Sequence, residues 1–342
     1  MLRVVVIDDS PVARDLIVEI LNAEEDIQVV GVAPDGQAGV DLVSELRPDI
    51  VTMDVQMPRM DGYEATREIM VAQPTPIVVV SGSMDTPDVE KSMQSLQAGA
   101  LTVIGKPHAP TSSKFEKTAH MLVDTVRTMS AVKVVRHRPL PEAVPDAPPM
   151  PYFPEDRQSF QVIAMAASTG GPQTVYQILS ALPANFSLPV LYVQHISDGF
   201  SEGLANWLRA STELDVRLAQ HGEELSPGTV YLCGEDRHLE VSQDGRIALT
   251  DQPPVGGFRP SASLMFESVA KAFGSHALAI ILTGMGRDGV DGLKAVRQLG
   301  GHVLAQDKES SVVFGMPRAA IEEEIHDAVV NPQQIADYLR QL

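Results

Sequence analysis

Short apolar segments, most of them ending in a polar residue, alternate with amphipathic helical segments along almost the whole chain. In the first 128 residues the apolar segments are VVVI, IQVVGVA, DIVTMD, PIVVVSG and LTVIGKP. Helical stretches such as DLIVEILNA and AGVDLVSEL lie between them. Strands that alternate with helices form parallel sheets covered by helices on both faces. The pattern predicts an α/β fold that begins with a doubly wound parallel-sheet domain.

A proline-rich segment divides this pattern in two. The sequence HRPLPEAVPDAPPMPYFPEDRQ has few large aliphatic residues and cannot form a packed core, so we interpret residues 129–159 as an interdomain linker. A second series of strand-like segments follows: QVIAMAAS, LPVLYVQH, VRLAQ, TVYLCG, IALTD, ALAIILTG and HVLAQD. We therefore expect two doubly wound parallel-sheet domains, over 1–128 and 160–342.

The composition narrows the classes of function. Lys and Arg total 26 against 45 Asp and Glu, a net charge of −19, which argues against nucleic acid and anionic membranes as main partners. The single cysteine, Cys233, excludes an internal disulfide and fits a reducing cytoplasm. Apolar runs such as ALAIIL fall short of the roughly 20 residues that span a bilayer. We expect a cytoplasmic protein without membrane insertion.

Polar residues at strand ends form a first candidate site. Asp8 and Asp9 end the first apolar segment and Asp54 ends the third, so three carboxylates should meet at one edge of the sheet. They would repel one another unless a cation lay among them, and oxygen ligands of this kind suit Mg²⁺. A Mg²⁺ beside Asp54 would neutralise charge on an incoming phosphoryl group. Ser81 and Lys106, at two further strand ends, could hydrogen-bond and pair with a phosphate oxygen.

With these residues in place, positions 1–128 resemble a response-regulator receiver domain, a flavodoxin-like fold. The resemblance rests on VVVIDDS, TMDVQMPRMDG, VVVSGS and GKP. It implies that Asp54 is the phosphoacceptor, that Asp8 and Asp9 bind the metal with it, and that a histidine kinase donates the phosphoryl group. Ser81 would be the switch hydroxyl and Lys106 the phosphate partner.

One position departs from the receiver pattern. Receivers often carry Tyr or Phe shortly before the final Lys, whereas this chain reads LTVIGKP, with Val103 at that place. We therefore expect signalling to depend more on the loop around Ser81 than on an aromatic switch.

A second candidate site lies in the C-terminal half. Ser168 in AASTGGP stands between a predicted strand and a predicted helix, His195 ends the next strand, and Asp288 lies in the loop TGMGRDG. A serine nucleophile needs a base, which His195 would supply, and Asp288 would fix the tautomer of the imidazole. Backbone N–H groups near Thr169 and Met285 are candidates for an oxyanion hole. The pattern indicates a serine hydrolase.

Each of these residues also has a simpler interpretation. Ser168 could be a helix N-cap, His195 a packing histidine, and Asp291 could take the place of Asp288. Cys233, with His238 nearby, is a rival nucleophile, although a small buried residue is the better interpretation of a cysteine at an apolar strand end. The glycines of STGGP could cradle a dinucleotide, but GK[ST] and the full G-x-G-x-x-G are absent and the next strand ends in His195 rather than an acidic residue.

Residues 160–340 resemble the catalytic domain of the chemotaxis protein-glutamate methylesterase family (CheB type), which is Rossmann-like. The segments that carry the likeness are ASTGGP, VQH, GTVYLCGEDRHLEV, RPSASLMFESVA, ILTGMGRDG and VVFGMPRAA. The resemblance implies hydrolysis of glutamate γ-methyl esters on methyl-accepting chemoreceptors, and often deamidation of receptor glutamines, with no cofactor for the ester step. The positions that differ from the usual pattern are Ala166, Ile196, Ser197, Asn206, Trp207 and Phe258.

Together the two sites predict an esterase that resets receptors when Asp54 is phosphorylated. An unphosphorylated receiver would cover the catalytic cleft, and phosphorylation would loosen that packing. The alternative from another class is a receptor-binding regulatory module with weak or no turnover, for which the altered residues after His195 are the best support. A nucleotide-dependent oxidoreductase is a more distant alternative.

Overall fold

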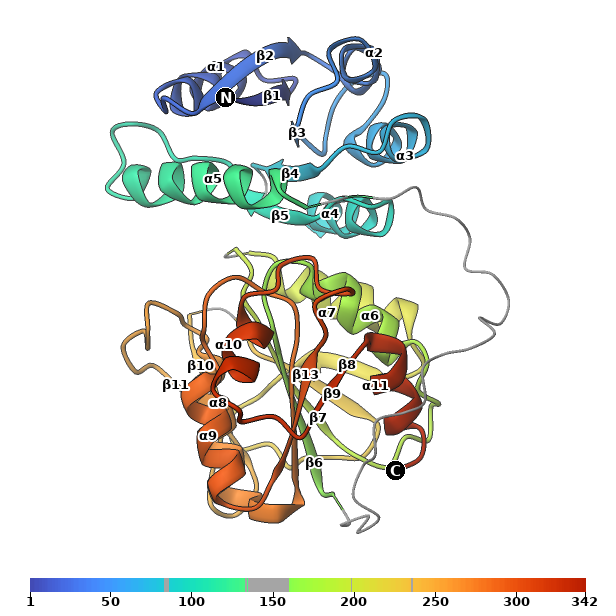
Figure 1. The fold of residues 1–342 in the computed structure, drawn as a ribbon, viewed down its shortest axis with the longest axis vertical. Helices are drawn as coiled ribbons and strands as arrows, with labels where there is room; N and C mark the ends of the chain where they lie inside the picture. The colour runs from blue at the N-terminus through green and yellow to red at the C-terminus, as the bar shows by residue number, and fades with distance from the viewer. Residues whose placement is uncertain (83–85, 133, 135–159, 198, 235) are drawn as a thin grey trace. The chain divides into compact units, whose positions relative to one another are not determined.

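The computed structural model describes residues 1–82, 86–132, 134, 160–197, 199–234 and 236–342 (Figure 1). The chain divides into two compact units, Met1–Ala143 and Val144–Leu342. Of the expected linker over 129–159, residues 133 and 135–159 lie outside the described residues.

The first unit is a parallel five-stranded sheet with the strand order β2-β1-β3-β4-β5. Its strands are β1 (Leu2–Ile7), β2 (Ile27–Ala33), β3 (Ile50–Met53), β4 (Ile77–Ser81) and β5 (Thr102–Gly105). The helices are α1 (Pro11–Asn22), α2 (Gly36–Leu46), α3 (Gly62–Ala72), α4 (Thr86–Gln97) and α5 (Phe115–Ser130). The order reverses between β1 and β3, and in doubly wound sheets ligands bind outside the carboxyl ends of the strands at such a point.

The second unit is built on a seven-stranded parallel sheet with the order β14-β13-β12-β6-β7-β9-β8. Its strands are β6 (Val162–Ala167), β7 (Val190–Gln194), β8 (Asp215–Leu218), β9 (Thr229–Leu232), β12 (Ala277–Ile281), β13 (His302–Gln306) and β14 (Ala328–Val330). All residues of the central strands β6, β7 and β12 are buried, as expected for a sheet covered on both faces.

Helices cover both faces of this sheet (Figure 1). The helices α8 (Ala262–Phe273), α9 (Val290–Gln298) and α10 (Met316–Glu322) pack on one face, and α6 (Gly171–Leu179), α7 (Ser201–Ser211) and α11 (Pro332–Leu339) lie on the other. The C-terminal helix α11 docks through an apolar face, in which Ile335 and Leu339 are fully buried. Within the described part of the chain, no helix is long and apolar enough to cross a membrane.

Local sequence explains several helix starts. Ser10 caps α1, and its Oγ accepts a hydrogen bond from Ala13 N at 3.4 Å. Asp61 and Glu64 form a capping box at the start of α3, as Asn331 and Gln334 do at α11. These side chains satisfy N–H groups that the first turn of a helix leaves unpaired.

The two doubly wound sheets confirm the expected fold, but three elements were not anticipated. The first is β10 (His238–Val241), which pairs with β11 (Ile247–Thr250), the predicted strand IALTD, in an antiparallel hairpin outside the parallel sheet. The short strand β14 and the helix α10 also lack a prediction. The three residues of β14 and the seven of α10 are too few to produce a clear periodic pattern.

Candidate active site and phosphorylation site

Three carboxylates of the first unit meet at the carboxyl end of its sheet. Asp8 and Asp9 follow β1, and Asp54 follows β3, the two strands between which the sheet order reverses. One ligand oxygen of each residue lies within 4.8 Å of the others. Asp8 and Asp54 are buried, whereas Asp9 is exposed. Clustered carboxylate oxygens suit Mg²⁺, so these residues fit the expected cation.

Lys106 places a positive charge within this cluster. Its Nζ lies 2.8 Å from Asp8 Oδ2 and 2.9 Å from Asp54 Oδ2. Its backbone N–H donates to the carbonyl oxygen of Ser81 at 2.8 Å, so the ends of β4 and β5 lie side by side. Burial raises the pKa of Asp54 to about 6, although Lys106 opposes this effect. A carboxylate that burial makes costly to ionise gains most from an adjacent cation.

Val103 occupies a core position in β5. The side chain is only 4% exposed. A buried valine cannot swing between an inward and an outward position as an aromatic ring at the surface can. The role of the loop around Ser81 in signalling stays a prediction.

In the second unit, Ser168 lies in the turn between β6 and α6. Its backbone N–H donates to Thr283 O at 3.0 Å, and its carbonyl oxygen accepts from Gly171 N at 2.9 Å. The N-cap of α6 is Gly170, so the interpretation of Ser168 as the N-cap is wrong. Gly284 packs directly against the serine, because a methyl group at its Cα would lie 2.7 Å from Ser168 Cβ.

His195 stands beside Ser168 at the neighbouring strand end. Ala167 of β6 pairs with Gln194 of β7, the last pair in the register of these two strands. Ser168 and His195 each follow one member of this pair. The backbone N–H of His195 continues this ladder by donating to Ala167 O at 2.9 Å. The imidazole stacks on the ring of Phe258, with centroids 4.2 Å apart and an interplanar angle of 11°. No hydrogen bond is described between the Ser168 hydroxyl and the imidazole.

Asp288, in the loop between β12 and α9, binds both the histidine and the start of a helix. Its Oδ2 accepts from His195 Nε2 at 3.0 Å. Four other donors come from the start of α8 and its N-cap Ser261: Ala262 N at 2.7 Å, Ser263 Oγ at 2.8 Å, Ser261 Oγ at 3.0 Å and Ser263 N at 3.2 Å. Gly289, the residue after Asp288, donates its N–H at 2.9 Å. The carboxylate is buried and fully hydrogen-bonded.

These bonds determine the protonation of the pair. Burial alone would raise the pKa of Asp288, but the hydrogen bonds and charge interaction with His195, together with those from α8, lower it to about 2. An ionised carboxylate only accepts hydrogen bonds, so His195 Nε2 carries the proton. His195 Nδ1 is then the basic nitrogen, and this atom is buried without a hydrogen-bond partner among the described residues.

Thr169 and Met285 flank the serine on two different loops. Thr169 follows Ser168 directly, and its carbonyl oxygen accepts from Thr283 Oγ1 at 2.9 Å. Met285 follows Gly284, and the residue is 48% exposed. Both backbones are therefore near the serine, and their role as oxyanion donors stays a prediction.

The rival candidates, Cys233, His238 and Asp291, have features of structural residues. Cys233, at the end of β9, is 3% exposed, and burial raises the pKa of its thiol to about 12. His238 is fully buried, and its Nδ1 accepts from Ser261 N at 3.1 Å, so it has a structural role. Asp291 lies in the first turn of α9 with 82% of its side chain exposed, as expected of a helix-start residue.

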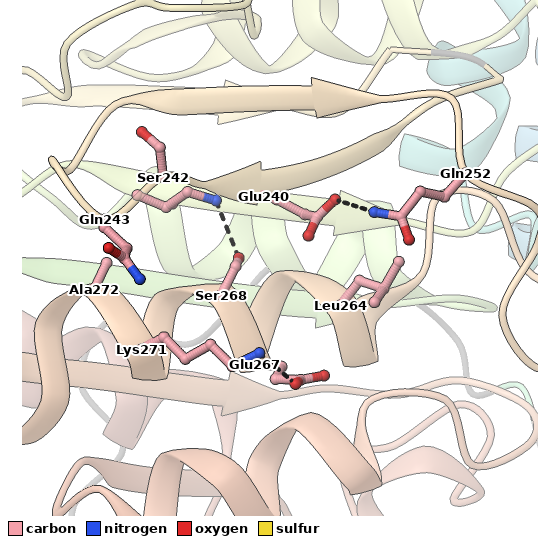
Figure 2. A pocket seen from close by; sticks show the side chains of 10 residues that line it. Glu240, Ser242, Gln243, Gln252, Leu264, Glu267, Ser268, Lys271 and Ala272 are labelled. Carbon is pink, nitrogen blue, oxygen red and sulfur yellow. Dashed lines mark hydrogen bonds and ion pairs between the residues drawn. The ribbon is translucent and has the colours of Figure 1, made fainter.

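Two hollows lie in the second unit. A cavity of about 360 Å³ lies between the β10–β11 hairpin and α8, lined by residues such as Glu240, Gln252 and Lys271 and by none of the candidate catalytic residues (Figure 2). A groove of about 470 Å³ is lined by Met285, Phe314 and neighbouring residues. Since Met285 is adjacent to the glycine that packs on Ser168, this groove borders the candidate active site.

Several residues of the site were missed in the sequence. Phe258 contacts the histidine, although the sequence indicated it only as a departure from the family pattern. Ser261 and Ser263 contact the aspartate, although their segment indicated only the family likeness. Gln194 was also passed over; the available signal was a polar residue closing an apolar strand directly before His195.

Comparison with known proteins agrees with this arrangement. Residues 4–113 match the family model for the response regulator receiver domain, and residues 163–339 match that for CheB methylesterase. The chain thus joins a phosphorylation-responsive receiver to a hydrolase domain. It belongs to the CheB methylesterase family.

Individual relatives align with almost the whole chain. The protein-glutamate methylesterase/protein-glutamine glutaminase 4 of Myxococcus xanthus is 50% identical over 97% of this chain and 94% of its own length. A corresponding protein from Anaeromyxobacter dehalogenans is 49% identical over 99% of this chain and 98% of its own length. The crystal structure of the Thermotoga maritima CheB methylesterase catalytic domain aligns with 54% of this chain and 98% of its own, at 39% identity and a TM-score of 0.52.

Proposed function

We infer that this protein hydrolyses glutamate γ-methyl esters on chemoreceptors and is activated by phosphorylation of its receiver. The observation that carries the inference is the hydrogen bond of 3.0 Å between His195 and Asp288, formed at the strand end next to Ser168. This pair lies inside the segment that matches the CheB methylesterase model. Deamidation of receptor glutamines follows the same chemistry, with ammonia as the leaving group in place of methanol.

The protonation of the pair defines the steps. Ser168 Oγ attacks the γ-carbonyl carbon while its proton passes to His195 Nδ1, because Nε2 already carries the proton bonded to Asp288. The tetrahedral oxyanion is bound by backbone N–H groups at Thr169 and Met285. Methanol leaves with the proton from Nδ1. Water then attacks the acyl-enzyme by the same route and releases the glutamate.

The receiver supplies the control. Asp54 accepts a phosphoryl group from a histidine kinase. Asp8, Asp9 and Asp54 would hold a Mg²⁺, which would neutralise charge on that group. Lys106 pairs with the phosphate, and Ser81 donates a hydrogen bond to it. The receiver over 1–128 then ceases to restrict a catalytic domain over 160–342, to which residues 129–159 join it. We place this activity in the cytoplasm, where receptors and kinase meet.

Methanol release from methylated receptor membranes tests this function. The parent chain should release methanol, faster with a phosphodonor present, and Ser168→Ala should abolish release. Release by Ser168→Ala at the parental rate would refute the assignment of the nucleophile. If the parent binds receptors but releases no methanol under either condition, the chain is a receptor-binding module instead.

A further inference from the structure

We infer that Gln194 is a positioning residue that holds the backbone of the nucleophile against the backbone of the base. The inference rests on the proposed function of Ser168 and His195. Gln194 is the last residue of β7, and its side chain is buried, with 5% exposed. Its Nε2 donates to Ser168 O at 2.6 Å and to His195 O at 2.9 Å. One amide group therefore joins the two residues that must exchange a proton.

The orientation of this amide is fixed by a third contact. Tyr192 is fully buried two residues earlier on the same strand, and its hydroxyl group donates to Gln194 Oε1. If the amide were flipped, its oxygen would face two carbonyl oxygens, and its NH₂ group would face the hydroxyl. Both donors and the acceptor are satisfied only in the observed orientation.

The start of α6 leaves space for this amide. A methyl group at Gly171 Cα would lie 2.2 Å from Gln194 Oε1. A residue with a side chain at 171 would therefore displace the amide. The three groups Tyr192, Gln194 and Gly171 form a buried unit, whose hydrogen bonds to the nucleophile and the base end on their main-chain carbonyl oxygens. This unit cannot take part in bond making, so its contribution is to geometry.

Loss of the amide should slow the chemical step with little effect on receptor binding. Without the two N–H donors, nothing on the side chain of residue 194 restrains the Ser168 and His195 carbonyls. Misplacement of reacting groups by about 1 Å can cost about 100-fold in rate. We expect Gln194→Met, which keeps the length of the side chain, to lower kcat about 30–100-fold. Tyr192→Phe, which removes only the hydrogen bond to Gln194 Oε1, should lower kcat about 3–10-fold.

The experiment measures kcat and KM for methanol release by the full-length parent, Gln194→Met and Tyr192→Phe. Gln334→Met is the matched control, because Gln334 is also a buried glutamine in a hydrogen-bonded pair but lies in α11. The inference requires a fall in kcat with KM within about twofold for the first two variants and an unchanged kcat for the control. Parental kcat in Gln194→Met, or an equal loss in Gln334→Met, overturns it.

A second measurement separates this inference from the esterase function. A fluorophosphonate probe reacts with an activated serine whether or not receptor esters are turned over. Gln194→Met should label at Ser168 more slowly than the parent by a factor similar to its loss in kcat. If the parent labels at Ser168 but releases no methanol, the proposed substrate is wrong while the labelling rates still test the positioning role. Equal labelling rates in parent and Gln194→Met overturn that role.

Discussion

Replacement of Asp288 by asparagine should inactivate the enzyme by reversing the tautomer of His195. An asparagine has one acceptor oxygen, but both carboxylate oxygens face fixed backbone donors: Ser263 N and Gly289 N at Oδ1, and Ala262 N at Oδ2. The orientation with fewer donor–donor contacts places the NH₂ group at the Oδ2 position. That group would donate to His195 Nε2, move the ring proton to Nδ1 and remove the base. We expect kcat to fall about 10³–10⁴-fold.

The same substitution should destabilise the second unit by about 2 kcal/mol, the value of one hydrogen bond to a charged group. The pKa of Asp288 gives a similar figure, because the gap between its ordinary value of 3.8 and about 2 corresponds to about 2 kcal/mol. A carboxyl whose folded pKa is depressed stabilises the protein above its unfolded pKa. The stability difference between parent and variant should therefore persist above about pH 4 and disappear as the pH falls toward about 2.

Two assays check these expectations. Methanol release gives kcat, and urea unfolding at several pH values gives the stability difference. Asp291→Asn is the matched control, because Asp291 has 82% of its side chain exposed and pairs with Lys294 at 3.4 Å, away from His195. The reasoning fails if Asp288→Asn keeps more than a tenth of the parental kcat, or if Asp291→Asn loses as much activity.

Three further predictions concern the receiver, the stacked ring and the cysteine. Asp54→Asn should remove the stimulation of methanol release by a phosphodonor, because an amide cannot accept a phosphoryl group; stimulation equal to the parent's would place the phosphoacceptor elsewhere. Phe258→Ala should lower kcat about 2–10-fold, because a stacked ring pair contributes about 0.5–1.5 kcal/mol. Phe258→His keeps an aromatic ring and should lower kcat less. Equal losses of kcat in the two variants would exclude stacking as the cause. Cys233→Ala should release methanol at a rate within about twofold of the parent's, and a loss of rate above tenfold would restore Cys233 as a rival nucleophile. The native thiol should react slowly with iodoacetamide at pH 8, since burial raises its pKa to about 12.

The principal site residues could be predicted because of one property of parallel sheets. The carboxyl ends of parallel strands meet at one edge, so polar residues that close apolar segments must approach one another there. Asp8, Asp54 and Lys106 come from three such ends, and the Lys106 ammonium lies within 2.9 Å of both carboxylates. Ser168 and His195 follow the same rule on β6 and β7. The sequence carries this information locally, in the residue that ends each strand.

The supporting residues could not be predicted, because their contacts depend on the order of strands and on loop conformations. Ser261 and Ser263 reach Asp288 across 27 and 25 residues, through the approach of α8 to the loop after β12. No period or spacing in the sequence encodes that approach. The stacking of Phe258 on His195 likewise depends on a loop outside the parallel sheet.

Asp288 shows that a structural and a catalytic interpretation can apply to different atoms of one side chain. Ser261 is the N-cap of α8, yet its side chain makes no capping hydrogen bond within the helix. The carboxylate of Asp288 accepts from the first N–H groups of α8 instead, where the helix dipole favours a negative charge. Oδ1 is bound almost entirely by the helix start, while Oδ2 also holds His195. The donors that anchor the helix therefore also keep the carboxylate ionised, and an ionised Asp288 is what leaves His195 Nδ1 free to accept the proton of Ser168.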